Sequence, residues 1–221
     1  MLVSALILCT ACHRTTKIPE TIESDFIQYK VHYLEEKAGD IPTRILPNTM
    51  DAYYTHYYVL TRIEGFFGQF SLIQIANLRN KRVTTLLNFF GNKVYYTGDG
   101  HELPAGIKPL EIKNLEYTHD TMRLADLLSY RIEVKTDESL YDIFYTKDIR
   151  IKHPNITTPY EAVNHPLSAF RIQLSYLHMD LVTHTHEKRM IESSAFTVPE
   201  EYKPVSRKAM EEIINSLFTK E

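Results

Sequence analysis

From residue 25 onward, the chain alternates short apolar runs with turn-forming positions. The runs are rich in β-branched and aromatic residues, which favour a half-buried pleated surface, and they recur every ~8–12 residues. Predicted strands cover residues 26–34, 51–63, 69–76, 82–90, 93–97, 107–117, 130–135, 139–145, 169–177 and 179–189. Parallel neighbours would each need a connecting helix of about a dozen residues, which this spacing does not provide. The pattern therefore predicts a mainly β domain built on an antiparallel sheet.

Two helices are also predicted, so the fold class is mainly β with some α. Thr158-Pro159-Tyr160-Glu161 is a capping box with proline at the first helical position, which predicts a short helix over residues 159–164. A second helix is predicted over residues 207–218, because an apolar stripe at helical spacing follows Ser206. The stripe consists of Met210, Ile213, Ile214, Leu217 and Phe218. Residues 121–128 fit either a helix or a strand.

The first twelve residues follow a different pattern. Residues 2–11 form an uncharged apolar run that is too short to span the ~30 Å hydrocarbon core as a helix, but it has the length of a signal's apolar region. The small pair Thr10-Ala11 before Cys12 resembles the lipobox of bacterial lipoproteins, in which cleavage leaves a lipid-carrying cysteine at the new amino terminus. We therefore expect a signal peptide over residues 1–11, a lipid anchor at Cys12 within a tether over residues 12–24, and a single domain over residues 25–221.

Both cysteines of the chain lie in this first segment. Positions 13–221 contain none, so the body cannot form an internal disulfide, and a domain of this size needs none. An alternative interpretation makes the segment a buried strand in which Cys9 and Cys12 are small apolar side chains.

Composition excludes several classes of protein. The chain has 25 Lys+Arg against 28 Asp+Glu, a net charge of −3, whereas a nucleic-acid binder usually carries a strongly basic face. Hydrophobic residues make up 43%, which is typical of a globular domain. The GxSxG, HExxH, Walker, GxGxxG and EF-hand patterns are all absent from the sequence. We therefore predict no cofactor, no catalytic residue and no nucleic-acid partner.

Two histidines are the candidate metal ligands. His184 and His186 are two residues apart in a predicted strand, so regular alternation would place them on one face, the spacing that metal ligands on strands use. Asp180 has the same parity. The same parity also fits a solvated face that consists of Asp180, His184, His186 and Lys188. We assign no metal to them, and a metal-dependent enzyme that uses His184 and His186 remains one alternative function.

The carboxy-terminal half contains a series of recognisable segments. They are Tyr145-Thr146-Lys147-Asp148-Ile149, Pro154-Asn155, Pro159-Tyr160, the paired strands 169–189, and the ending Phe196-Thr197-Val198-Pro199-Glu200-Glu201-Tyr202-Lys203-Pro204-Val205-Ser206. In these segments the chain resembles a group of bacterial envelope lipoproteins whose fold is similar to that of the LolA/LolB lipoprotein carriers. The resemblance implies a strongly curved, incomplete antiparallel barrel with helices on its open side, suited to holding an acyl chain or another apolar group.

These observations together lead to a functional expectation. The protein is expected to be a non-catalytic envelope protein that faces the periplasm, is held on a membrane through Cys12, and binds an apolar or amphipathic ligand in the half-barrel. His13 directly after Cys12, rather than an aspartate, favours the outer membrane by analogy with enteric bacteria. The alternative is an interaction or scaffold module with a filled core.

Overall fold

The computed structural model describes residues 20–99 and 101–218, so the expected signal peptide and Cys12 lie outside the described residues. The strands of the main sheet are β1 (Thr21–Tyr33), β4 (Thr49–Tyr54), β5 (Tyr58–Gly65), β6 (Phe70–Asn77), β7 (Arg82–Phe89), β8 (Asn92–Thr97), β9 (Asn114–Leu124), β10 (Leu127–Lys135), β11 (Leu140–Thr146), β12 (Leu167–Leu174), β13 (Leu177–Glu192) and β14 (Lys203–Pro204). The remaining elements are β2 (Lys37–Ala38), β3 (Ile41–Pro42), the 3-10 turns η1 (Thr43–Ile45), η2 (Phe66–Gly68) and η3 (Ser193–Phe196), and the helix α1 (Arg207–Ser216).

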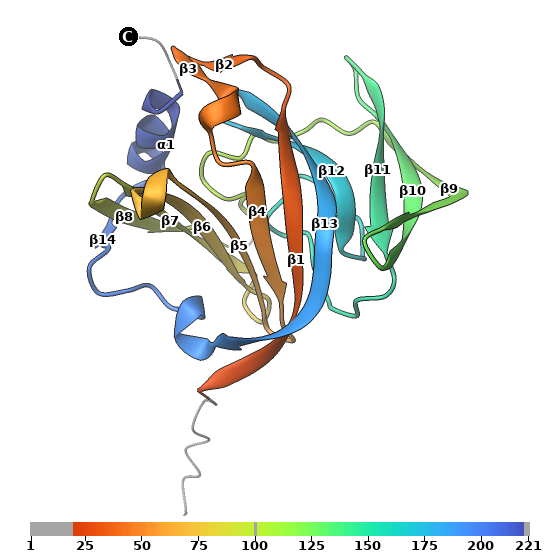
Figure 1. The fold of residues 1–221 in the computed structure, drawn as a ribbon, viewed down its shortest axis with the longest axis horizontal. Helices are drawn as coiled ribbons and strands as arrows, with labels where there is room; N and C mark the ends of the chain where they lie inside the picture. The colour runs from red at the N-terminus through yellow and green to blue at the C-terminus, as the bar shows by residue number, and fades with distance from the viewer. Residues whose placement is uncertain (1–19, 100, 219–221) are drawn as a thin grey trace, which may run out of the picture.

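The twelve strands form one curved sheet in the order β14-β8-β7-β6-β5-β4-β1-β13-β12-β11-β10-β9 (Figure 1). All neighbours are antiparallel except the short β14–β8 pair. The sheet does not close, because β14 and β9 remain its two edges. The prediction of a mainly β, antiparallel domain is therefore confirmed. No helix within residues 20–99 and 101–218 has the length and apolarity needed to cross a bilayer.

Two predicted strands differ from those in the structure, and the structure decides one ambiguous stretch. The run 51–63 is two strands, β4 and β5, because Thr55 makes a turn in which its hydroxyl accepts a hydrogen bond from the backbone N–H of Tyr58 at 2.9 Å. Residues 107–113 are not a strand, and only Ile107 forms an isolated bridge, with Leu174. The ambiguous stretch 121–128 is β structure, since it contains the end of β9 and the start of β10.

The predicted helix over residues 159–164 is wrong. The chain makes successive turns there, although Thr158 does accept the hydrogen bond expected of a cap, from the Tyr160 N–H at 3.2 Å. The helix does not continue because the Tyr160 hydroxyl reaches into the sheet and donates to the Arg171 carbonyl at 2.7 Å. Tertiary burial of one aromatic side chain therefore outweighs the local helix signal.

The predicted C-terminal helix is confirmed as α1. The Ser206 hydroxyl caps it by accepting a hydrogen bond from the Ala209 N–H at 3.2 Å. Met210 and Ile214 of the predicted stripe are completely buried, while α1 itself ends at Ser216, two residues before the predicted end. Because an isolated helix of this length is marginal in water, contact with the sheet holds it in place.

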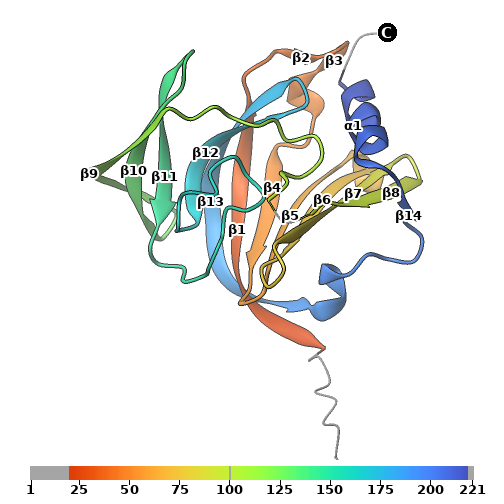
Figure 2. The same cartoon turned by 180° about the vertical axis from the view of Figure 1, so that it is seen from behind.

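The main core lies on the inner face of the curved sheet, where Ile27, Tyr29 and Val31 of β1 are buried. Figure 2 shows the connecting segments 101–113 and 147–166 crossing this face. They contribute buried side chains to the same core, including Ile107 and Ile156, and α1 adds Met210 and Ile214. A smaller core on the outer face is covered by Phe196, whose ring stacks on that of Tyr58 at 4.8 Å. The inner face is consequently filled.

Candidate functional site

The two predicted histidines do not lie on one regular strand face. The pairing of β13 with β1 skips His184: Thr183 lies opposite Tyr29, and His186 lies opposite Ile27. Tyr29 and Ile27 both belong to the inner core, so the alternation changes phase at a β-bulge. His184 is exposed at the bulge, whereas the His186 side chain is only 13% exposed. The spacing argument fails here because it assumed unbroken alternation.

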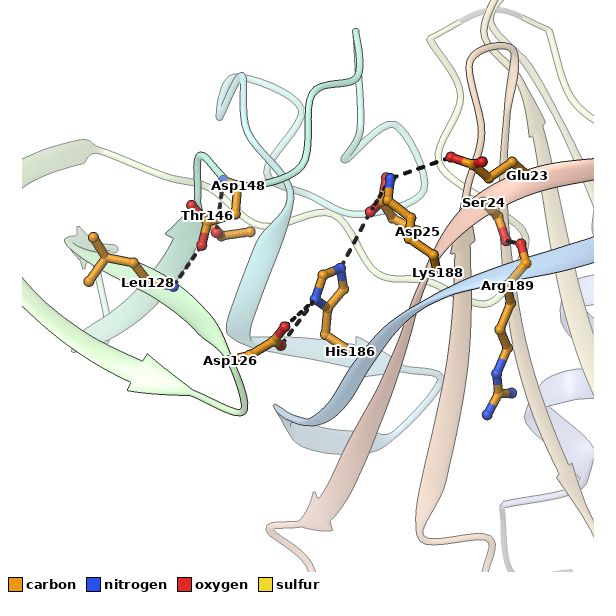
Figure 3. Close-up of polar contacts among 10 residues, drawn as sticks. All are labelled: Glu23, Ser24, Asp25, Asp126, Leu128, Thr146, Asp148, His186, Lys188 and Arg189. Carbon is orange, nitrogen blue, oxygen red and sulfur yellow. Dashed lines mark hydrogen bonds and ion pairs between the residues drawn. The ribbon is translucent and has the colours of Figure 1, made fainter.

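His186 lies between two carboxylates, as Figure 3 shows. Its Nδ1 is 3.0 Å from the Asp126 carboxylate and its Nε2 is 3.4 Å from that of Asp25. The Lys188 ammonium is 2.8 Å from a carboxylate oxygen of Asp25. Both ring nitrogens of His186 thus lie within hydrogen-bonding distance of a carboxylate oxygen. Because Asp126 lies in the turn between β9 and β10, this network links the edge hairpin to the two central strands.

A second contact holds the same hairpin. The Asp148 carboxylate accepts a hydrogen bond from the Leu128 N–H at 2.8 Å, and the Asp148 N–H donates to the Thr146 hydroxyl at 3.2 Å (Figure 3). The two carboxylates around His186 lie on opposite sides of the ring and do not converge on one point. Within the part of the chain that the structure describes, no group of three histidine, cysteine or carboxylate side chains is arranged to hold a metal ion. The His186 network therefore acts as a polar cross-link between the β9–β10 turn and the strands β1 and β13.

The apolar cavity lies at one end of the sheet, which we call the helix end. The helix end consists of residues 33–48, 65–70, 89–92, 174–177 and 217–218. The cavity has a volume of about 60 Å³. It is lined by Tyr33, Ile41, Leu46, Pro47, Ile63, Phe66, Phe70, Phe89, Leu174, Leu177, Met179, Leu217 and Phe218. The Tyr33 hydroxyl donates to the Pro47 carbonyl at 2.6 Å, and burial raises the pKa of Tyr33, so the lining carries no charge at neutral pH.

Exposed apolar side chains surround the cavity. Among the described residues, six of the eleven exposed large hydrophobic side chains lie at the helix end, which concentrates apolar surface there. These six are Leu34, Ile41, Ile45, Phe67, Phe90 and Tyr176. Such a concentration at one end of a monomer is typical of an interaction site.

Two Phe-Phe-Gly turns build much of this surface. Residues 66–68 lie between β5 and β6, and residues 89–91 comprise the last residue of β7 and the turn that leads to β8. In each turn the first phenylalanine lines the cavity, whereas the second is exposed, fully for Phe67 and by 65% for Phe90. Phe67 and Phe90 have positive φ angles of 54° and 47°, a conformation that costs a non-glycine residue on the order of 1–3 kcal/mol. The repeated tripeptide is a sequence signal that strand periodicity does not reveal.

A second, polar cleft of about 470 Å³ lies beside β12. Arg171 makes a two-pronged ion pair with Asp180 at 2.7 and 3.0 Å and lies over the ring of Tyr141. The Tyr160 hydroxyl is 3.0 Å from that of Tyr141, and burial raises the pKa of both phenols. This cleft offers hydrogen-bonding and charged groups, so it does not suit the predicted apolar ligand.

No protein-family model matches the chain, and no curated protein matches it. Among solved structures, the fold is similar to PNGF-II in its C2 crystal form, with a TM-score of 0.52 and 12% identity over 87% of this chain and 32% of PNGF-II. The P21 form gives a TM-score of 0.50 at 12% identity over 89% of this chain and 33% of PNGF-II. The chain thus spans about a third of PNGF-II. At this identity the similarity shows the β-rich fold alone, and the resemblance to LolA and LolB stays a prediction.

Proposed function

We propose that the protein is a non-catalytic, periplasm-facing envelope protein, lipid-anchored at Cys12, that binds an apolar or amphipathic ligand. The observation that carries the proposal is the uncharged cavity at the helix end, surrounded by exposed apolar side chains on strained turns. The lipobox-like residues before Cys12 support the anchor, and the outer membrane is the favoured location.

The ligand site lies at the helix end rather than along the inner face of the half-barrel. Met210, Ile214, Ile156 and Tyr160 occupy that face, which leaves no open trough for a whole acyl chain. The cavity of about 60 Å³ is too small for a whole acyl chain, so it admits only the end of one alkyl chain. Each methylene buried there would contribute about 0.8 kcal/mol, and the rest of the chain would lie against the exposed rim.

The filled inner face also supports the second candidate, an interaction module that docks a protein partner. Both candidates use the helix end, but they differ in what enters the cavity. A ligand-binding protein takes an alkyl chain into it, whereas a docking module uses only the outer rim.

Photo-crosslinking separates the two candidates. Full-length protein in lipid nanodiscs is irradiated with a twelve-carbon fatty acid that carries a diazirine at the chain end, and adducts are located by mass spectrometry. Ile41, 37% exposed, lines the cavity, so Ile41→Asp should lower the adduct yield at least about tenfold by placing a carboxylate at the mouth. Leu140→Asp, at a 61% exposed position away from the cavity, is the matched control and should leave the yield unchanged. Equal yields from both variants would exclude the cavity as the ligand site.

The anchor is tested separately. Cys12→Ser should abolish palmitate labelling and leave the protein unprocessed, because the lipid-carrying thiol is lost. Cys9→Ser removes the neighbouring thiol and should label like the wild type. Undiminished labelling of the Cys12→Ser protein would show that the anchor is elsewhere or absent.

A further inference from the structure

The two Phe-Phe-Gly turns act as one unit. The Phe90 N–H donates to the Gln69 carbonyl at 2.7 Å, and the Asn88 side-chain amide donates to the Gly68 carbonyl at 3.2 Å. The turns therefore lie side by side, with Phe67 and Phe90 exposed above a cavity that their neighbours line. The hairpin turns themselves require the positive φ angles, but the outward position of both phenylalanines beside an uncharged cavity creates an apolar surface that fits an apolar occupant.

The helix end lies far from the point where the chain would leave the membrane. β1 begins at Thr21, at the opposite end of the sheet from β2, β3 and α1 (Figure 1). Its thirteen residues span about 40 Å at ~3.3 Å per residue. Nine residue steps separate Cys12 from Thr21, and even a fully extended chain covers at most about 32 Å in that length. The tether is therefore shorter than β1 measured along the strand, which favours an orientation in which the helix end faces away from the bilayer that holds Cys12.

Charged side chains gather at the opposite end, near Thr21. Asp25, Asp126, His186 and Lys188 form the ion network there, with Glu23 3.9 Å from the Lys188 ammonium. Charged side chains suit contact with water and lipid headgroups, whereas the apolar rim lies at the other end of β1. The charged end of the domain thus lies next to the tether, and the apolar end lies far from it. This arrangement agrees with the orientation that the tether length favours.

We propose that the helix end faces away from the anchoring bilayer, and that the paired Phe-Phe-Gly turns capture a single alkyl chain of an amphiphile arriving from the aqueous side. This inference rests on the proposed function, and it adds the source of the ligand. The uncharged cavity accepts the chain end, Phe67 and Phe90 cover the following methylenes, and the polar head of the amphiphile stays in water. A bilayer surface as occupant would require a longer tether.

The sequence contains no tryptophan, so one introduced tryptophan reports on its own surroundings. Acylated full-length Phe67→Trp protein is placed in phosphatidylcholine vesicles with brominated acyl chains, which quench tryptophan on contact. We expect the emission of Phe67→Trp to be unchanged in brominated and plain vesicles. In plain vesicles, added 12-bromododecanoate should remove most of that emission, and Ile41→Asp in the same background should restore it.

Two further variants keep the test decisive. Phe90→Trp repeats the measurement at the equivalent position of the second turn, in case Phe67→Trp fails to fold. Met190→Trp places the reporter on β13 opposite Glu23, near Thr21, where bromododecanoate should cause no Ile41-dependent quenching. Quenching of Phe67→Trp by the brominated bilayer would overturn the orientation while leaving ligand binding intact. Absence of quenching by bromododecanoate would overturn the alkyl-chain occupant, and loss of palmitate labelling in Cys12→Ser would still report independently on the anchor.

Discussion

Replacing Ile214 by alanine tests whether α1 completes the inner core. The Ile214 side chain is 1% exposed, and it lies directly against the backbone of Gly106. A Cβ on Gly106 would come within 2.9 Å of Ile214 Cδ1, and the φ angle of Gly106 is +88°. The close approach and the left-handed backbone both require glycine there, which shows how tightly the helix packs on this segment.

The expected cost follows from this packing. Ile214→Ala removes three buried carbons, which at ~0.8 kcal/mol each amounts to about 2.4 kcal/mol of lost transfer free energy. A cavity term adds to this, because Gly106 has no side chain that could move into the space. We therefore expect the free energy of unfolding to fall by about 3–4 kcal/mol, within the range of such core truncations.

The assay is urea unfolding of the full chain, monitored by circular dichroism. The dependence of the unfolding free energy on urea concentration is compared between variants, so that a change in stability is distinguished from a change in the denatured state. Ile213→Ala is the matched control, because Ile213 lies on the same helix, is only partly buried and gains the same helix propensity from alanine. It should lose clearly less stability than Ile214→Ala. Equal losses, or a loss below about 1 kcal/mol for Ile214→Ala, would mean that α1 is a lid rather than part of the core.

Two further predictions concern polar groups. His186→Gln should lower the free energy of unfolding by about 1–3 kcal/mol, because the imidazole contacts to Asp25 and Asp126 are lost, whereas His184→Gln should stay within ~0.5 kcal/mol in the same urea assay. Equal effects would mean that the His186 network does not stabilise the fold. The hydrogen bond from Tyr96, together with Arg207, lowers the pKa of Glu102, so its contribution is present above the unfolded pKa and is lost as pH falls through the folded pKa. Urea midpoints at neutral pH and near pH 3 should therefore differ less for Glu102→Gln than for the wild type, and an identical difference would contradict the assignment.

Local patterns account for what could be predicted of the fold. The strand runs and the stripe of α1 were predicted because side chains that alternate or recur at helical spacing must bury one face wherever the element lies. Thr55, which breaks a long β run by hydrogen bonding its own turn, and Tyr160, which reaches across to β12, were not predicted. Both features depend on side-chain hydrogen bonds, which either add to the local backbone preference or outweigh it.

The sequence by itself determined the antiparallel β pattern, the capped C-terminal helix and the lipobox-like segment before Cys12, because each depends on neighbouring residues. Tertiary structure alone decided three other features. Because of the bulge at His184, His186 pairs with Ile27, an inner-core residue of β1, whereas the β1–β13 pairing skips His184. The segments 101–113 and 147–166 filled the inner face, and the antiparallel pairing of β6 with β7 brought Phe67 and Phe90 to the same end. Each of these features arises from register and curvature accumulated over many residues, so no single stretch of sequence encodes it.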